Sequence, residues 1–304
     1  MSWRTVVITQ HAKLSYSGRM MIVQTDSKIH SIPIEDISVL MIATTQAVIT
    51  SALVAKLSQN QSKIIFVDNH YLPVSETCCY YSSSRTLESL RKQFEWDEYR
   101  KENLWTHIVA GKISNQTSVI ESLGIDTEDL EKEADKLEFG DATNREAVVA
   151  RKYFELLFGS GFKRRSDDEE ECVNAALNYG YSIILSSFSR AIVANGCLTH
   201  IGIHHSNNQN EYNLASDLME PFRPIIDLYV AVQNFTEFSR SIRMSLINLL
   251  NQEIQLNGQK MRISTAIEKH VSNCIRFLNG DLDNIEIEVD FTDEVQSYEI
   301  NGHV

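Results

Sequence analysis

Short apolar runs dominate the first quarter of the chain. They lie between residues 3 and 73, are rich in Val, Ile and aromatic residues, and are separated in places by turn residues such as Ser17-Gly18. The exception is Thr45 to Gln59, where apolar residues recur at helical spacing behind a threonine cap. We predict a small β-rich N-terminal domain over residues 1–73 that contains one helix.

Beyond Pro73 the pattern changes. Residues 74–85 are polar and rich in serine, which predicts a linker. Residues 86–280 then follow a helical pattern, and its segments are an amphipathic stretch from Leu87 to Lys112, an acidic one over 124–139, Asn144 to Phe158 before Gly159, and Cys172 to Asn195 before Gly196. We predict an α+β fold: a small N-terminal β-rich domain followed by a larger all-α C-terminal domain.

The last part of the chain, residues 281–304, is an acidic tail. It contains eight Asp or Glu residues and neither Lys nor Arg. Within it, IEIEVDF (285–291) alternates apolar and acidic positions, which is typical of a strand, although so acidic an end is equally consistent with a solvated segment.

The net charge of −13 is unfavourable for a nucleic-acid partner, because phosphate binding requires a basic surface. Much of this charge is local, however: the tail and the acidic segment 121–139 account for most of it, and the remainder is near neutral. Basic groups remain at Arg145, Arg151 and Lys152; at Lys163, Arg164 and Arg165; and at Arg240 and Arg243. Net charge alone therefore does not decide the partner.

Composition indicates an ordinary globular protein. Hydrophobic residues make up 43%, and the five cysteines show no C-x-x-C pair, which favours a reducing cytoplasm over a disulfide framework. The N-terminus carries no signal-peptide pattern. Residues 37–55 carry no charge, but their Ser, Thr and Gln favour a buried strand and a helix over a membrane span. We expect a cytoplasmic protein with no membrane partner.

The segment from Leu198 to Asp227 concentrates groups that carry out chemistry. His205 follows Gly202 by three residues, and Asp217 and Glu220 are three apart, so that on a helix both carboxylates share one face. A histidine and a carboxylate, joined by one carboxylate from elsewhere, form a set that can hold a divalent metal. Taken singly, such residues are more often surface histidines, helix caps or simple ion pairs.

Longer motifs surround these residues. The sequence reads Gly-x-x-His, a polar spacer, then Asp-Leu-Met-Glu-Pro-Phe-Arg-Pro, and it is preceded by ATNREAVVARKY (142–153) and NAALNYGYSIIL (174–185). Together they resemble the CRISPR-associated endonuclease/integrase of the spacer-acquisition complex, most closely its type II-A form. One departure is Ala147, where many relatives have Gly.

The resemblance implies roles for residues at matching positions. Glu146, His205 and Glu220 match the family's catalytic metal ligands, and two oxygens with one nitrogen suit Mg²⁺ or Mn²⁺. Asp217, Asn178 and Arg223 would support the ligands or the phosphate, and no other cofactor is implied. The implied reaction is attack of a DNA 3′ hydroxyl or of water on a phosphodiester bond.

The resemblance also implies partners. They are double-stranded DNA, as protospacer and CRISPR repeat; a second copy of the chain, with the N-terminal domain forming the dimer; a small ferredoxin-like adaptation subunit; and, more distantly, other adaptation proteins and the type II effector nuclease. Two alternatives stay open on the residues alone. One is a metal-dependent nuclease for branched DNA in repair, and the other is a non-catalytic DNA-binding scaffold whose acids and histidines only pair and cap.

Overall fold

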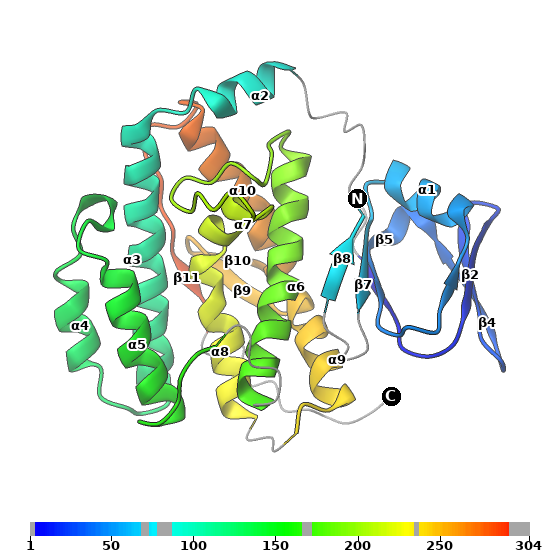
Figure 1. Ribbon diagram of the computed structural model, residues 1–304, viewed down its shortest axis with the longest axis horizontal. Coiled ribbons are helices and arrows are strands. Elements are labelled where there is room, and N and C mark those ends of the chain that lie inside the picture. Colours follow the sequence, from blue (N-terminus) through cyan, green and yellow to red (C-terminus); the bar gives the residue numbers. More distant parts are fainter. Residues whose placement is uncertain (1–3, 68–72, 78–86, 166–171, 234–236, 292–304) are drawn as a thin grey trace. The chain divides into compact units, whose positions relative to one another are not determined.

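The computed structural model describes residues 4–67, 73–77, 87–165, 172–233 and 237–291. The chain divides into two compact units, Met1–Ser82 and Ser83–Val304 (Figure 1). Two four-stranded sheets lie in the first unit, whereas helices dominate the second. The predicted α+β class, with a β-rich N-terminal and a helical C-terminal region, is therefore confirmed. Within the described ranges, no helix combines the length and the apolar character needed to cross a membrane.

The first unit is built on two sheets. In one, β1 (Arg4–Ile8), β5 (Ile37–Ile42) and β7 (Lys63–Val67) run parallel, and β8 (Pro73–Glu76) is antiparallel to β7. In the other, the order is β4 (Ile29–Pro33), β3 (Met20–Gln24), β2 (Lys13–Ser17) and β6 (Val48–Ile49). All six residues of β5 are buried, which agrees with its unbroken apolar run because a central parallel strand is covered on both faces.

Two predicted boundaries in this unit were wrong. The helix α1 (Ser51–Gln59) starts behind Thr50, whose hydroxyl accepts a hydrogen bond from the Leu53 amide, and not at Thr45. Val48 and Ile49 pair with β2 instead. The predicted linker begins with a strand, since β8 pairs with β7; residues 78–85 of the linker lie outside the described residues. A short 3₁₀ turn, η1 (Ile34–Asp36), precedes β5.

The second unit contains most of the helices. The described α-helices are α2 (Leu87–Phe94), α3 (Glu98–Ser122), α4 (Glu128–Ala134), α5 (Arg145–Phe158), α6 (Cys172–Ala194), α7 (Asn213–Leu218), α8 (Arg223–Val232), α9 (Arg240–Asn248) and α10 (Ile263–Leu278). The described 3₁₀ helices are η2 (Phe139–Asp141), η3 (Glu220–Phe222) and η4 (Leu249–Asn251).

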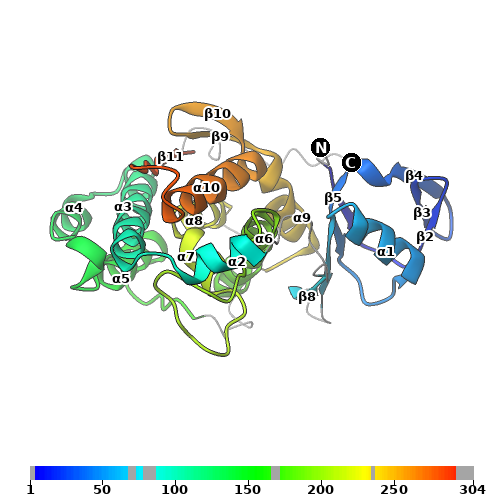
Figure 2. The same ribbon diagram turned by 90° about the horizontal axis from the view of Figure 1, so that it is seen from above.

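Helix α6 forms the centre of this unit. It is buried nearly all round, as its apolar composition predicts, and it contacts α7, α8, α9 and α10 (Figure 2). Gly180 allows α8 to approach closely, because a Cβ at this position would lie 2.5 Å from the Ile226 side chain. The predicted helix ends are confirmed: α5 stops at Gly159 and α6 shortly before Gly196, both with positive φ.

The amphipathic stretch from Leu87 to Lys112 is two helices and not one. Asp97 has extended backbone angles and caps α3 by accepting a hydrogen bond from the Arg100 amide at 3.0 Å. Trp96, just before this cap, is buried, and its indole nitrogen donates to Asn279. The chain therefore turns at the tryptophan, and α3 starts in a new direction.

The second unit is not helical throughout. A three-stranded sheet joins β10 (Gln259–Arg262), β9 (Glu253–Leu256) and β11 (Val289–Asp290). The strand β11 belongs to the predicted acidic tail, where Ile285, Val289 and Phe291 are buried and the acids between them are exposed. The described part of the tail thus packs through its apolar side chains, and within 285–291 only Val289 and Asp290 form a strand.

Candidate functional site

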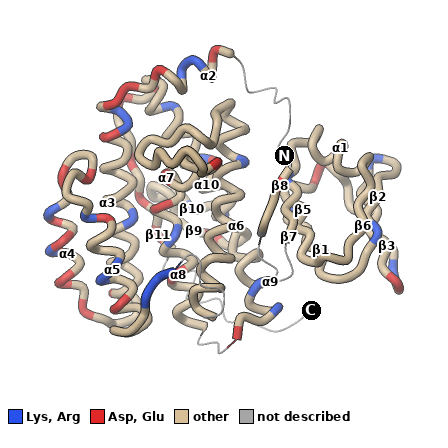
Figure 3. The backbone as a smooth tube through the Cα atoms, in the orientation of Figure 1, with Lys and Arg blue, Asp and Glu red and all other residues tan. Residues whose placement is uncertain are grey.

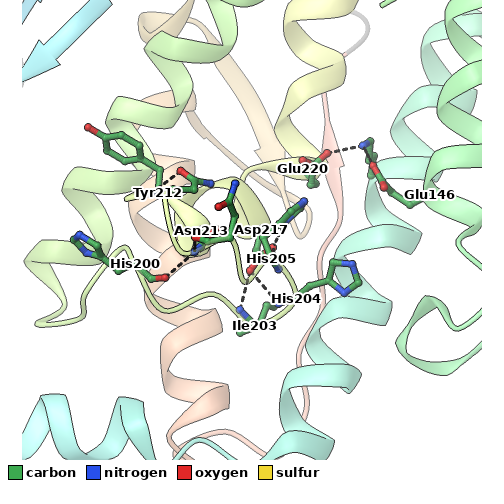
Figure 4. A network of polar contacts seen from close by, with 12 residues as sticks. Glu146, His200, Ile203, His204, His205, Tyr212, Asn213, Asp217 and Glu220 are labelled. Atoms are coloured by element: carbon green, nitrogen blue, oxygen red, sulfur yellow. Dashed lines mark hydrogen bonds and ion pairs between the residues drawn. The ribbon is translucent and has the colours of Figure 1, made fainter. Parts of the chain in front are cut away.

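Two carboxylates from different elements meet at one buried lysine. Lys112, on the inward face of α3, donates hydrogen bonds to Glu146 Oε1 on α5 and, at 2.5 Å, to Glu220 Oε2 in η3. Figure 4 shows Glu146 and Glu220 in this neighbourhood, beside the loop that carries His205. The side chains of Lys112 and Glu220 are buried, whereas Glu146 is partly exposed. The site is therefore closed on the Glu220 side and more open on the Glu146 side.

Glu146 lies in the first turn of α5, and an acid further back fixes that turn. The carboxylate of Asp141 accepts hydrogen bonds from the amides of Arg145 at 2.6 Å and Glu146 at 3.2 Å. These amides would otherwise lack partners at a helix start. Asp141 and Asn144 both adopt left-handed backbone angles that bring the chain into α5. Glu146 thus projects from a well-anchored helix start.

Glu220 is held against α3 by the backbone that follows it. Helix α7 ends at Leu218 and the chain continues as η3, which begins with Glu220 and Pro221. Asn115 of α3 donates to the Pro221 carbonyl at 2.6 Å, and Gly111 of α3 lies 3.7 Å, measured from an added Cβ, from the Pro221 ring. The asparagine therefore holds η3 directly on α3, whereas a Cβ at Gly111 would crowd Ile287 at 3.2 Å and make only ordinary contact with Pro221.

Two cations neutralise Glu220. Arg223 donates through Nε to Glu220 Oε1 at 2.8 Å, on the side opposite Lys112. Burial disfavours ionisation of Glu220, but the charges of Arg223 and Lys112 outweigh burial and lower the pKa of its carboxyl group. Burial likewise disfavours the charged form of Lys112, yet Glu220 and Glu146 outweigh it and raise the pKa of the lysine. Glu220, Lys112 and Arg223 therefore stay ionised together.

His205 is oriented by a fully buried acid. Its Nδ1 lies 2.5 Å from Oδ1 of Asp217, and because a carboxylate only accepts, the imidazole is the donor. Asp217 also accepts the amides of Ile203, His204 and His205, as the dashed lines of Figure 4 show in part. The hydrogen bond to Asp217 is the largest of the effects that raise the pKa of His205.

The loop around His205 requires a glycine and an aromatic support. A Cβ at Gly202 would lie 2.3 Å from the His205 carbonyl oxygen and 2.7 Å from Asp217 Oδ2, so no other residue fits there without a shift. The ring of His204 stacks on Trp105 of α3, with 4.2 Å between centroids. His204 therefore fixes the loop on α3 while its neighbour His205 binds Asp217.

A second buried network lies behind Arg223. Asp227 accepts hydrogen bonds from the hydroxyls of Tyr153 on α5 and Tyr181 on α6, and burial raises the pKa of Asp227 to about 6. The guanidinium of Arg223 lies over the Tyr181 ring, 4.6 Å from its centroid. Arg223 and Asp227, four residues apart on α8, take different hydrogen-bond partners: Arg223 binds Glu220, and Asp227 binds the tyrosines.

Asn178 lies on α6 and takes part in a different contact. Its side-chain oxygen accepts a hydrogen bond from Arg164 at 2.6 Å, and Arg164 also binds Asn174 and stacks on Tyr181. Asn178 thus connects to the site through Arg164 and Tyr181. The acids that follow Arg165 in the sequence, Asp167 to Glu171, lie outside the described residues.

Part of the predicted basic surface is neutralised within the protein. Glu133 of α4 binds Arg145, Lys152 and Lys136, each within about the distance of a hydrogen bond, and these contacts lower its pKa to about 2. Figure 3 shows acidic and basic residues interspersed along α4 and α5. Arg145 and Lys152 are therefore already paired.

The structure brings Glu146 and Glu220 together. His205 lies on the adjoining loop, and Asp217, in α7, accepts hydrogen bonds from that loop. The prediction that Asp217 and Glu220 share a helix face was wrong, because α7 ends between them. The Asp217 carboxylate instead accepts a hydrogen bond from the amide of His205. Nor do three His, Cys, Asp or Glu side chains form a metal-holding group within the described ranges. Lys112 stands between the two carboxylates instead.

Lys112 is the residue that sequence reasoning missed. It follows Leu104 and Ile108 at intervals of four on the buried face of α3. A lysine on such a face is rarely buried without an acidic partner. Its position in the apolar pattern of α3 therefore indicated a buried ion pair. The identity of the partners was not available, because both are distant in sequence.

The sequence matches the family described as CRISPR associated protein Cas1 over residues 5–234. The chain belongs to the Cas1 family. It is 34% identical over 280 residues to the CRISPR-associated endonuclease Cas1 of Neisseria meningitidis serogroup C (strain 8013), which covers 90% of this chain and 91% of that protein. The type II-A resemblance stays a prediction.

Solved structures share the fold of this Cas1 chain. A casposase bound to integration product superposes with a TM-score of 0.76 at 18% identity, covering 99% of this chain and 96% of that one. A chain of a Cas6-RT-Cas1–Cas2 complex gives 0.75 at 16% identity, covering 93% of this chain and 36% of that one. At these identities the similarity establishes the fold.

Proposed function

We propose that this Cas1 protein is a metal-dependent DNA endonuclease and integrase that inserts new spacer DNA into a CRISPR array. The observation that carries the proposal is the convergence of Glu146 and Glu220 on one cation beside His205. Family membership supports it, because the relative from Neisseria meningitidis is described as an endonuclease. The casposase of the same fold is bound to integration product, which supports strand joining.

The donor set fits a divalent cation. Glu146 and Glu220 supply two carboxylates that already point at a common positive charge. Because Asp217 takes the Nδ1–H of His205, the lone pair of that imidazole lies on Nε2, where a metal can be bound. Glu146, His205 and Glu220 would hold Mg²⁺ or Mn²⁺, and the imidazole favours Mn²⁺.

When bound, the metal would polarise a phosphodiester oxygen and make a DNA hydroxyl or a water molecule a better nucleophile. In strand transfer the 3′ oxygen of the incoming DNA forms a bond to phosphorus, and the 3′ oxygen of the cut strand leaves and takes up a proton. One phosphodiester bond replaces another, so no energy-rich co-substrate is needed. Asp217 keeps His205 in the required orientation, and Arg223 holds Glu220.

We further propose the partners that the family implies. They are double-stranded DNA, as protospacer and repeat, a second copy of the chain, and the small ferredoxin-like adaptation subunit. The neighbour of the same fold in a Cas6-RT-Cas1–Cas2 complex supports an adaptation partner. Binding to duplex ends through phosphates should weaken steeply with salt, by about 0.9 in the log–log slope for each neutralised phosphate.

An integration assay tests this function. The protein, its small partner, a short labelled duplex and a repeat-bearing plasmid are incubated with Mn²⁺ or Mg²⁺, and plasmid-linked label is measured. We expect joining with metal and none after chelation. Joining that persists in chelator would contradict metal dependence, and cleavage of branched DNA without joining would favour a repair nuclease.

A further inference from the structure

Lys112 occupies the position between the carboxylates that a metal ion would take. Its Nζ is 2.5 Å from Glu220 Oε2 and hydrogen bonded to Glu146 Oε1. Metal–oxygen distances for hard divalent cations are roughly 2.0–2.6 Å. An ion bound to these two oxygens would therefore fill the space where the ammonium group lies, and the two cations cannot be there together.

The charges of the groups in direct contact favour such an exchange. Glu146 and Glu220 carry two negative charges, and the cations that pair with them, Lys112 and Arg223, carry two positive ones. Adding a divalent ion without moving a cation would leave excess positive charge next to a buried ammonium group, which is costly at short range. Removing the lysine from the carboxylates relieves this repulsion.

Lys112 is the cation suited to move. Arg223 is held by Glu220 on one side and by the face of Tyr181 on the other, with a rigid planar group. A lysine has a flexible four-carbon stem and a compact charge. The Glu146 side chain is 25% exposed against 6% for Glu220, so the ammonium group can leave toward Glu146.

We propose that Lys112 is a resident counter-cation that holds Glu146 and Glu220 together in the metal-free protein. When the metal binds, it displaces Lys112 from the two carboxylates. The inference rests on the proposed metal site. Lys112 is then a positioning residue: it keeps two like charges converged before the metal arrives, and it makes metal binding an exchange of one cation for another. The consequence is a metal affinity limited by competition from within the protein.

The test compares Mn²⁺ binding to wild-type protein and to Lys112→Gln by isothermal titration calorimetry, without DNA. Removing the competing charge should tighten Mn²⁺ binding at least tenfold, which equals about 1.4 kcal/mol. The metal-free variant should unfold at a lower temperature, and Mn²⁺ should raise its unfolding temperature more than that of the wild type. Lys101→Gln, on the same helix but paired with Glu98 at its exposed end, is the matched control and should bind Mn²⁺ as the wild type does.

The outcomes separate this inference from the function on which it rests. Wild-type binding of Mn²⁺ with equal or weaker binding to Lys112→Gln overturns the exchange and leaves the metal site standing. Binding by neither protein overturns both. A Lys112→Gln chain that stays unfolded at Mn²⁺ concentrations that saturate the wild type also overturns the exchange, because the metal would then not replace the lysine.

Discussion

Nδ1 of His205 lies 2.5 Å from Oδ1 of Asp217, and the same buried carboxylate accepts the backbone amides of Ile203, His204 and His205. One acid thus shapes the loop and sets the tautomer of the imidazole on it. A buried carboxylate with four donors is well satisfied, and its oxygens are not available as further ligands. Asp217 therefore acts through His205.

The first prediction concerns this acid. Asp217→Asn keeps the shape but removes one acceptor and the negative charge, so the imidazole loses its fixed orientation. We expect strand-joining activity to fall by about 10–100-fold, with weaker Mn²⁺ binding, as for other residues that orient a metal ligand. The measurement is the integration assay with calorimetric Mn²⁺ titration. Asp129→Asn, at an exposed position on α4, is the control, and equal activity of both variants would refute the orienting role.

Gly202 provides the second prediction. In Gly202→Ala the added methyl group would meet the His205 carbonyl oxygen at 2.3 Å, and both atoms belong to the loop that holds the histidine. We expect a loss of about 1–3 kcal/mol in the free energy of unfolding and reduced joining activity. Chemical denaturation measures the first. Gly161→Ala, where an added Cβ meets nothing within 4 Å, should change stability by less than about 0.5 kcal/mol. Similar losses in both variants would argue against the crowding.

The third prediction concerns pH and a buried histidine that is not among the proposed metal ligands. His270 on α10 is buried, donates through Nε2 to the Leu218 carbonyl, and has its pKa lowered to about 4 by burial. Because its folded pKa lies below the ordinary 6.5, the unfolded chain takes up a proton first, and stability falls as pH drops from about 6.5 toward 4. The loss at pH 5 should be about 2 kcal/mol relative to neutral pH.

His270→Gln isolates this effect. Glutamine can still donate to Leu218 but does not titrate, so the difference in unfolding free energy between the two proteins should narrow by about 2 kcal/mol from pH 7 to pH 5. Asp227, whose raised pKa of about 6 favours the folded state as pH falls through this range, acts in the opposite direction. It is present in both proteins and cancels in the difference. A difference that does not vary with pH would contradict the assignment.

Much of the fold was predictable from local signals. Helices α5 and α6 end near Gly159 and Gly196, and the central strand β5 is an unbroken apolar run. The hydrophobic pattern and the glycine positions therefore both agree with the observed elements. The hairpin of β9 and β10 was missed although Asn257-Gly258, both with positive φ, is a strong turn signal. The break before α3 was missed because Asp97 reads as a surface acid unless its capping role is considered.

The candidate site was predicted less completely. Glu146, His205 and Glu220 came from family resemblance, because each alone reads as a surface or capping residue. The partners that hold them are distant in sequence: Lys112 lies 34 residues before Glu146 and 108 before Glu220. Which acid a buried lysine will meet depends on how α3, α5 and η3 pack, and periodicity within one helix carries no such information.

The most direct measurement for the proposed function is strand joining by Glu146→Gln, His205→Ala and Glu220→Gln, each verified as folded by circular dichroism, in Mn²⁺ with duplex DNA, repeat plasmid and the small partner. If the three side chains hold one metal ion, each change should reduce joining at least about 100-fold, a loss of about 2.7 kcal/mol in transition-state stabilisation. Glu155→Gln, an exposed position on the same helix as Glu146, should join like the wild type. Near-wild-type joining by any folded member of the three would contradict the shared metal site.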